Sequence, residues 1–296
     1  MPSAAIPNCF SIDLEDWAQS TLSPAVPLTE RVVANTQRML DLLAERRVRA
    51  TFFILGKVVE KFPATIRAVH AAGHEIASHG YGHDLVFNLE PRTFRDDVRR
   101  SIDLLGDCLG VRPLGYRAPA FSITARSLWA PPILAELGFT YSSSVFPFAG
   151  RRYGIPEAPR FPFRWNSCDL VEFPMTTARW LGRNLPVCGG GYFRLLPGWL
   201  ARAAIRSVNA EGQPAVIYMH PYEIDVHELR ELRAAGWEIP PRTYLMQSLF
   251  RGRMEGRLRT LFRRFEFDTL DRIVERLRAA GTIAPAPAIG APSALA

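Results

Sequence analysis

Short apolar runs alternate with amphipathic segments along most of this 296-residue chain. Seven runs have the length and residue types of buried strands: 9–12, 50–55, 73–77, 115–117, 139–143, 170–173 and 215–219. The clearest helix begins at Pro91, keeps apolar residues on one face, and ends at Gly110. Other helical segments follow Thr29 and Pro63 or cover 124–137 and 197–210. This alternation predicts an α/β fold with a barrel-like parallel sheet.

Polar residues suited to catalysis follow four of the predicted strands. Asp13, His79, Arg117 and His220 each stand at the carboxyl end of a strand. In a parallel barrel-like sheet these ends together form the active site. Purely structural polar residues would instead be scattered along the chain.

His79 and His83 are spaced as a candidate metal-binding pair. Residues four apart face the same way on one helical turn. A catalytic zinc ion takes about three protein ligands and a water, so a third ligand is needed. The best source is segment 13–16, which holds three carboxylates. A histidine pair alone, or carboxylates after a strand alone, more often has a structural role. The two together favour a metal site.

Composition narrows the class of protein and its surroundings. The chain is 48% hydrophobic and carries a net charge of +7, which favours an anionic partner such as a phospholipid surface, a phosphorylated glycan carrier or nucleic acid. Its four cysteines show no C-x-x-C spacing. Since neither a signal-peptide pattern nor a window of about 20 apolar residues is found, we expect a soluble cytoplasmic protein.

The chain is predicted to form one domain over residues 1–281, with a basic helical extension from about residue 226. Segment 148–164 is rich in proline and arginine and is expected to be an inserted loop. Residues 282–296 are predicted to form a disordered tail.

Six stretches of the sequence resemble the polysaccharide deacetylases of carbohydrate esterase family 4, the NodB-homology group. They are SIDLEDW (11–17), ATFFILG (50–56), GHEIASHGYGH (73–83), YRAPAF (116–121), GGGYFR (189–194) and YMHPYE (218–223). They occur in the family's order and are specific together, although each alone is weak. The chain is similar to the branch associated with bacterial exopolysaccharide (exosortase-linked) gene clusters. The resemblance implies a distorted (β/α)7 barrel, in agreement with the seven predicted strands.

The resemblance also implies an activity: a metal-dependent hydrolase that removes N-acetyl groups from N-acetylhexosamine units of an exopolysaccharide or its lipid-linked precursor. It implies a divalent metal, Zn2+ with Co2+, Ni2+ or Mn2+ as alternatives, held by His79, His83 and a carboxylate. Asp13 matches the catalytic base and Arg117 its partner. His220 matches the acid that protonates the leaving amine.

Three further residues are candidates for substrate contacts, and Ala120 takes its role from the same resemblance. The backbone N–H of Ala120 matches the oxyanion donor. Trp17 and Tyr192 are candidate sugar contacts, and for Trp17 a place in the core is an equal alternative.

Two departures from the family pattern affect the site. The family's consecutive aspartates are replaced by Asp-Leu-Glu-Asp, so the metal carboxylate is either Glu15 or Asp16. A register in which Glu15 is the base and Asp16 the ligand also stays open. The aspartate that normally tunes the acid histidine of the family would fall near Ser142 here. A serine cannot supply the charge, so we expect His220 to be less basic than in relatives.

Two other functions are compatible with these residues. An allantoinase-like enzyme would hydrolyse small cyclic amides or ureides on the same fold, and a narrow, closed pocket would favour it. A non-catalytic glycan-binding subunit would bind sugar without releasing acetate, which the change at Ser142 would permit.

Arginines crowd the segment Arg251 to Arg264, where Glu255 is the single acid. A solvated helix face over a core stripe explains most of them. The excess charge predicts salt-sensitive peripheral contact with anionic membranes, with nucleic acid as the less favoured partner.

Overall fold

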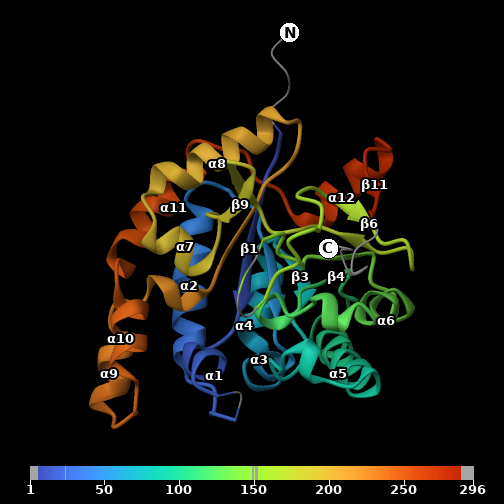
Figure 1. Cartoon of the computed structure of the whole chain (residues 1–296). Coiled ribbons are helices and arrows are strands. Elements are labelled where there is room, and N and C mark those ends of the chain that lie inside the picture. The colour runs from blue at the N-terminus through green and yellow to red at the C-terminus, as the bar shows by residue number, and fades with distance from the viewer. Residues whose placement is uncertain (1–5, 24, 149, 151–152, 288–296) are drawn as a thin grey trace, which may run out of the picture.

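A curled sheet lies at the centre of the molecule (Figure 1), and nine strands of the described chain belong to it. The computed structural model describes residues 6–23, 25–148, 150 and 153–287. The strand order is β10-β1-β2-β3-β4-β5-β7-β6-β11. These strands are β1 (Cys9–Leu14), β2 (Thr51–Ile54), β3 (Glu75–Ser78), β4 (Gly115–Tyr116), β5 (Tyr141–Ser142), β6 (Phe163–Arg164), β7 (Val171–Glu172), β10 (Val216–Met219) and β11 (Ala284–Pro285).

The strands from β10 to β7 in this order are parallel, and they lie at the seven predicted runs. The predicted α/β fold of the distorted (β/α)7 type is therefore confirmed. Beyond β7 the sheet continues into the antiparallel β6 and then β11. β7 thus pairs with β6, and the parallel strands curl into a half-barrel.

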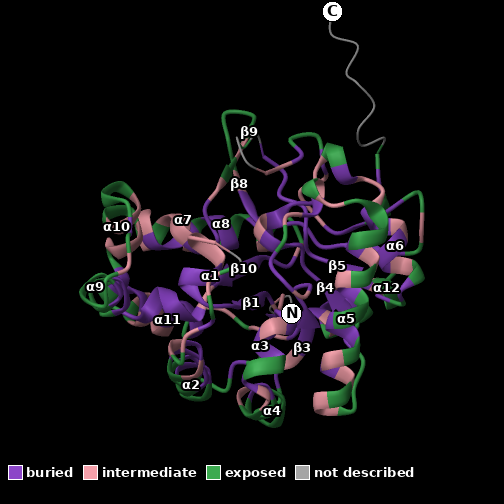
Figure 2. Ribbon diagram, turned by 90° about the horizontal axis from the view of Figure 1, so that it is seen from below, coloured by how far each residue is buried: buried purple, intermediate pink, exposed green. Residues whose placement is uncertain are grey.

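Helices surround the sheet, and their outer faces are exposed while its parallel strands are mostly buried (Figure 2). They are α1 (Trp17–Thr21), α2 (Arg31–Ala44), α3 (Gly56–Lys61), α4 (Pro63–Ala71), α5 (Pro91–Leu109), α6 (Ala130–Glu136), α7 (Gly190–Leu195), α8 (Gly198–Ala210), α9 (Glu228–Ala234), α10 (Pro241–Ser248), α11 (Met254–Phe262) and α12 (Leu270–Ala279). A separate hairpin is formed by β8 (Thr177–Trp180) and β9 (Arg183–Pro186).

Side chains alternate between the two faces of the central strands. Phe52 packs into the cluster under the helices, whereas Phe53 belongs to the cluster inside the curled sheet. Asp13 is in register with Phe53, and Phe53 with Ala77. The alternation therefore places Asp13 and, two residues beyond Ala77, His79 toward the same interior.

The C-terminal extension packs onto the barrel. Leu258 and Leu261 of α11 join the cluster beneath the helices, and Ile273 of α12 joins the interior cluster. The first residues of the expected tail are ordered instead, because Ala284–Pro285 pair with β6 and Ala286 is buried. Residues 288–296 of that tail lie outside the described residues.

Several arginines of segment 251–264 have internal partners. Arg251 is buried and pairs with Glu228 at 2.7 Å. Arg257 donates to three backbone carbonyls at the end of α7, and Arg259 pairs with Glu45. The segment's surface charge is thus smaller than the sequence suggested. In the described ranges, no helix combines the length and apolarity needed to cross a membrane.

Replacing Gly115 by alanine tests the packing of β4 against β5. The added Cβ would lie 2.0 Å from a ring carbon of Tyr141, so we expect the free energy of unfolding to fall by about 1 to 3 kcal/mol. Gly106→Ala is the matched control, since nothing lies within 4 Å of its Cβ. Within helix α5 that change should add about 0.5 to 1 kcal/mol. Equal urea midpoints for the two variants would contradict this packing.

Candidate active site

Glu15, His79 and His83 meet in the interior at the carboxyl end of the strands. Their ligand atoms all lie within 4.8 Å of one another, and all three side chains are buried. Glu15 Oε2 is 2.9 Å from His83 Nε2 and 3.6 Å from His79 Nε2. The positions of a carboxylate and two imidazoles match the ligand set of a divalent metal.

The hydrogen bonds of this cluster suit a metal ion. His79 Nδ1 donates to the carbonyl oxygen of Arg117 at 2.8 Å, because a carbonyl can only accept. In a neutral ring the lone pair then lies on Nε2, which faces Glu15. Glu15 Oε2 is buried and accepts no well-directed hydrogen bond. A cation between these acceptors would satisfy both, so the residues fit a divalent ion.

Glu15 is held in its ionised form. Burial opposes ionisation, but the charges of His83 and His220 outweigh it and hold the pKa of Glu15 well below its usual range. A ligand carboxylate must be deprotonated to bind a metal. The site is therefore prepared for one over the neutral pH range.

Asp13 forms a fully buried ion pair with Arg117. Nη1 of Arg117 donates to Asp13 Oδ1 at 2.7 Å and to Ser11 Oγ at 2.9 Å. Nε and Nη2 of the same guanidinium donate to the backbone carbonyl and hydroxyl of Ser143, both at 3.0 Å. The guanidinium also lies 4.0 Å above the ring of Phe53. These contacts fix Asp13 in the cavity that Glu15, His79 and His83 also line.

His220 stands on the other side of Glu15. Its Nε2 is 3.2 Å from Glu15 Oε1, and its Nδ1 is 2.9 Å from Glu223 Oε1. Burial lowers the pKa of His220, but Glu15 and Glu223 outweigh this effect and raise it to about 9. Arg194 Nε donates to the other oxygen of Glu223 at 3.3 Å. His220 thus has a carboxylate partner that is itself held by an arginine.

His220 does not depend on Ser142 for a charged partner. Ser142 Oγ bonds to Ser144 Oγ at 2.8 Å, and the carboxylate facing His220 Nδ1 comes from Glu223. Pro221 begins a short 3-10 turn that brings Glu223 back to His220. Glu223 could have been found from the sequence, because it follows His220 by three residues. No feature near His220 in the sequence indicated Arg194.

A cavity of about 180 Å3 joins these groups. Its lining includes Asp13, Glu15, His79, His83, Ala120, Tyr218 and His220. Ala120 adopts a left-handed backbone (φ 49°), which is costly for a residue with a Cβ and typical of functional turns. Ala118, in the same turn, donates its backbone N–H to Ser144 Oγ at 2.9 Å. The turn thus brings Ala120 to the cavity wall.

Three predicted site residues lie elsewhere. Asp16 caps α1 and accepts hydrogen bonds from Ala18 N and from the backbone and hydroxyl of Thr29, so its oxygens are occupied away from the histidines. Trp17 is fully buried in the core, where a sugar cannot reach it. Tyr192 lines a separate apolar groove instead of this cavity. Of the two candidate metal carboxylates, the fold brings Glu15 to the histidines.

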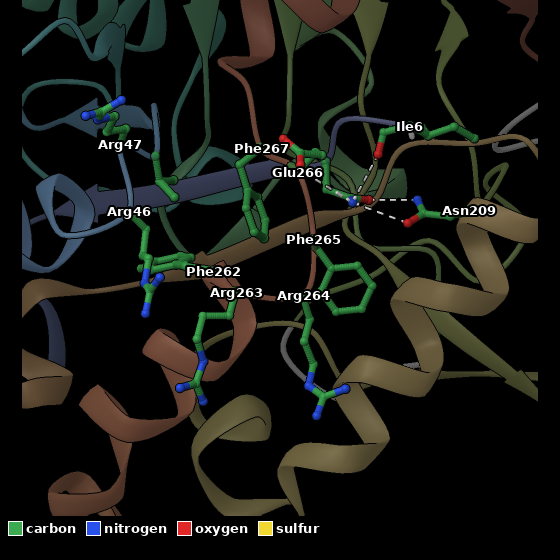
Figure 3. A pocket seen from close by; sticks show the side chains of 12 residues that line it. Ile6, Arg46, Arg47, Asn209, Phe262, Arg263, Arg264, Phe265, Glu266 and Phe267 are labelled. Atoms are coloured by element: carbon green, nitrogen blue, oxygen red, sulfur yellow. Dashed lines mark hydrogen bonds between the residues drawn. The ribbon is translucent and has the colours of Figure 1, made fainter. Parts of the chain in front are cut away.

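A cavity of about 480 Å3 lies near the amino ends of the strands (Figure 3). Its lining includes Asn8, just before β1, and four arginines. Arg47 points away from Arg46, Arg263 and Arg264 in this view. The guanidinium groups do not converge, and this cavity is at the opposite strand ends from the histidines.

The fold and the site define a candidate metal centre in a half-barrel, and comparisons with known proteins show what the chain is similar to. Residues 26–142 match the family model described as polysaccharide deacetylase, and residues 143–275 match a domain of unknown function, DUF3473. The first of these segments is therefore similar to a polysaccharide deacetylase domain.

Curated relatives carry related names. The chain is 30% identical over 133 residues to the peptidoglycan deacetylase-like protein FGM2 of Gibberella zeae, covering 45% of this chain and 36% of that protein. It is 32% identical over 96 residues to a Bacillus cereus peptidoglycan-N-acetylglucosamine deacetylase, covering 32% and 35%. A Bradyrhizobium chitooligosaccharide deacetylase is 35% identical over 101 residues, covering 34% and 43%. The chain thus spans less than half the length of each relative.

Solved structures share the fold over nearly the whole chain. A Mycobacterium smegmatis structure assigned to the polysaccharide deacetylases superposes with a TM-score of 0.60 at 22% identity, covering 97% of both chains. PuuE allantoinase superposes with a TM-score of 0.61 at 17% identity, covering 94% of this chain and 92% of that one. At these identities the likeness shows the fold, which both kinds of enzyme share.

Replacing Glu223 by glutamine tests the partner of His220. Loss of the negative charge beside Nδ1 should lower the pKa of His220 from about 9 toward its ordinary value. NMR titration of the imidazole in metal-free protein measures this shift. Ser142→Ala is the control and should leave the pKa unchanged. A shift in the control but not in Glu223→Gln would show that Ser142 governs the acid.

Proposed function

We propose that the protein is a metal-dependent N-deacetylase acting on N-acetylhexosamine units of an exopolysaccharide or its lipid-linked precursor. One observation carries this proposal: a Glu15, His79 and His83 cluster shares a cavity with the Asp13 and Arg117 ion pair. The names of the curated relatives support N-acetylated glycans as the substrate class.

Glu15, His79 and His83 would hold the divalent ion, which we expect to be zinc. When bound, the ion supplies Lewis acidity, which activates water and polarises the acetyl carbonyl. Asp13 accepts the proton of the water whose oxygen attacks the carbonyl carbon. Arg117 keeps Asp13 ionised and oriented through the 2.7 Å ion pair.

The remaining residues act on the developing charge and the leaving group. The backbone N–H of Ala120 donates to the oxygen that becomes negative. His220 Nε2 gives a proton to the amide nitrogen as the carbon–nitrogen bond breaks, which releases acetate and a free amine. Glu223 stabilises the protonated form of His220 that this step requires.

A cavity of about 180 Å3 is small, and this observation favours a second candidate, an allantoinase-like hydrolase of cyclic amides or ureides. The candidates differ in substrate size. A polymer must reach the cavity from its open side, whereas a cyclic ureide would be enclosed.

A substrate panel separates these functions. We expect acetate release from chitooligosaccharides or from an N-acetylated lipid-linked glycan, and loss of that activity with a chelator. Acetate and ammonia assays with and without added zinc measure it. Turnover of allantoin alone would establish the second candidate. Glycan binding without acetate release from any substrate would indicate a binding subunit.

Single substitutions separate the base from the metal ligands. Asp13→Asn should retain the metal and lower turnover by about 100-fold or more, because a base acts after the metal is bound. His79→Ala, His83→Ala and Glu15→Gln should lose metal and activity together. Elemental analysis of the purified protein measures the metal content. His70→Ala, on the exposed side of α4, is the control and should keep both metal and activity. Metal-free Asp13→Asn alongside metal-loaded Glu15→Gln would reverse the two roles.

We also propose a cytoplasmic location at the inner membrane. The four cysteines are free, which is usual in a reducing compartment. Of the arginines in segment 251–264, Arg253, Arg263 and Arg264 are exposed and stay the candidates for contact with anionic lipid. Nucleic acid is the less favoured partner.

A further inference from the structure

The β8–β9 hairpin exposes large apolar side chains to solvent. Trp180 is 61% exposed and Leu181 at the tip is 91% exposed. Leu181 adopts φ 46° and Gly182 φ 76°, so the two-residue turn holds a leucine in a conformation that favours glycine or asparagine. The hairpin projects from the body of the molecule (Figure 2). An apolar residue therefore occupies the place where a turn normally carries a polar one.

Helix α8 extends this apolar surface. Trp199 in its first turn is 58% exposed. Between α8 and the hairpin lies a groove of about 680 Å3, which includes Trp180, Leu185, Tyr192, Leu196 and Trp199 among its lining residues. Isolated exposed apolar residues are normal, but a contiguous group of this kind marks an interaction site. We call these residues, together with Leu181, the hairpin surface.

Positive charge surrounds the hairpin surface. Residues 173–210 contain five arginines and no acidic residue. Arg179, Arg183 and Arg206 are exposed. Within the described part of the chain, these three arginines form no ion pair of 4.0 Å or less. This contrasts with Arg259, which pairs with Glu45 and Glu255.

We propose that the hairpin surface docks on an anionic lipid bilayer. Tryptophan favours the membrane–water interface, the leucine at the tip can enter the acyl boundary, and the arginines can contact lipid phosphates. A second copy of this chain would bring the same unpaired positive charges into contact, and a neutral glycan would leave them unused. Nucleic acid would give no reason for an apolar tip.

The hairpin surface is connected to the catalytic cavity. Gly189, just before α7, forms a bridge with Tyr218, and Tyr218 lines the cavity. Tyr192 of α7 lines the groove. Docking would therefore place the membrane within one short helix of the cavity wall, but the binding itself does not depend on the proposed activity.

Vesicle sedimentation tests the proposal without any assay of catalysis. The probes are vesicles of phosphatidylcholine alone and of an equal mixture with phosphatidylglycerol, at low and high salt. We expect the full chain to pellet with the mixed vesicles at low salt and to be released by high salt. Trp180→Ser with Leu181→Ser, and separately Arg179→Gln with Arg183→Gln, should each weaken binding by about tenfold or more.

Matched variants control for composition. Arg92→Gln with Arg99→Gln also removes two positive charges, both exposed on α5. Leu245→Ser with Met246→Ser removes two exposed apolar residues of α10, 58% and 42% exposed. Both should bind within about twofold of the parent, and circular dichroism should show all variants folded. The proposal fails if the hairpin variants bind like the parent, or if the Arg92 and Arg99 variant loses as much binding as they do. It also fails if the parent does not bind anionic vesicles. Analytical ultracentrifugation that then shows self-association through the hairpin would identify a second copy of the chain as the partner.

Discussion

The buried guanidinium of Arg117 positions most of the candidate active site. It joins Ser11 and Asp13 of β1 to Ser143 after β5, while the carbonyl of the same residue orients His79 after β3. The Arg117 side chain is 0% exposed, so its charge has to be compensated by these partners. Removing one partner of a buried ion pair typically lowers the free energy of unfolding by about 3 to 5 kcal/mol. The curl of the sheet and the geometry of the site therefore constrain each other.

The site draws on both segments that match family models. Asp13 precedes the deacetylase segment, and His79 and His83 lie within it. His220, Glu223 and Arg194 come from the segment of unknown function. Because His220 and Glu15 are 3.2 Å apart, neither segment alone contains the whole constellation. The second segment thus takes part in building the cavity as well as in completing the sheet.

The parallel strands could be predicted because their apolar runs are bounded by turns and alternate with helices. Asp13, His79, Arg117 and His220 were predictable from their positions at strand ends. The choice between Glu15 and Asp16 was not, because β1 ends at Leu14 and strand alternation no longer fixes the direction of the side chains. Trp17 was ambiguous for the same reason.

Contacts between distant segments account for the other differences. β11 pairs with β6 over two residues, too short for a pattern to mark. Arg194 reaches Glu223 across 29 positions, and no local feature of the sequence encodes that approach. The partners of Arg251 and Arg259 are likewise remote, so a count of nearby acids overestimated the free charge of the C-terminal segment.

The position of α7 affects how the proton affinity of His220 can be changed. Arg194 donates to the carbonyls of Met246 and Leu249, and Arg257 donates to the carbonyls of Phe193, Arg194 and Leu196. The C-terminal helices thus hold the arginine that holds Glu223 against His220. Substitutions in this remote scaffold can alter proton affinity at the cavity while every cavity-lining side chain stays the same.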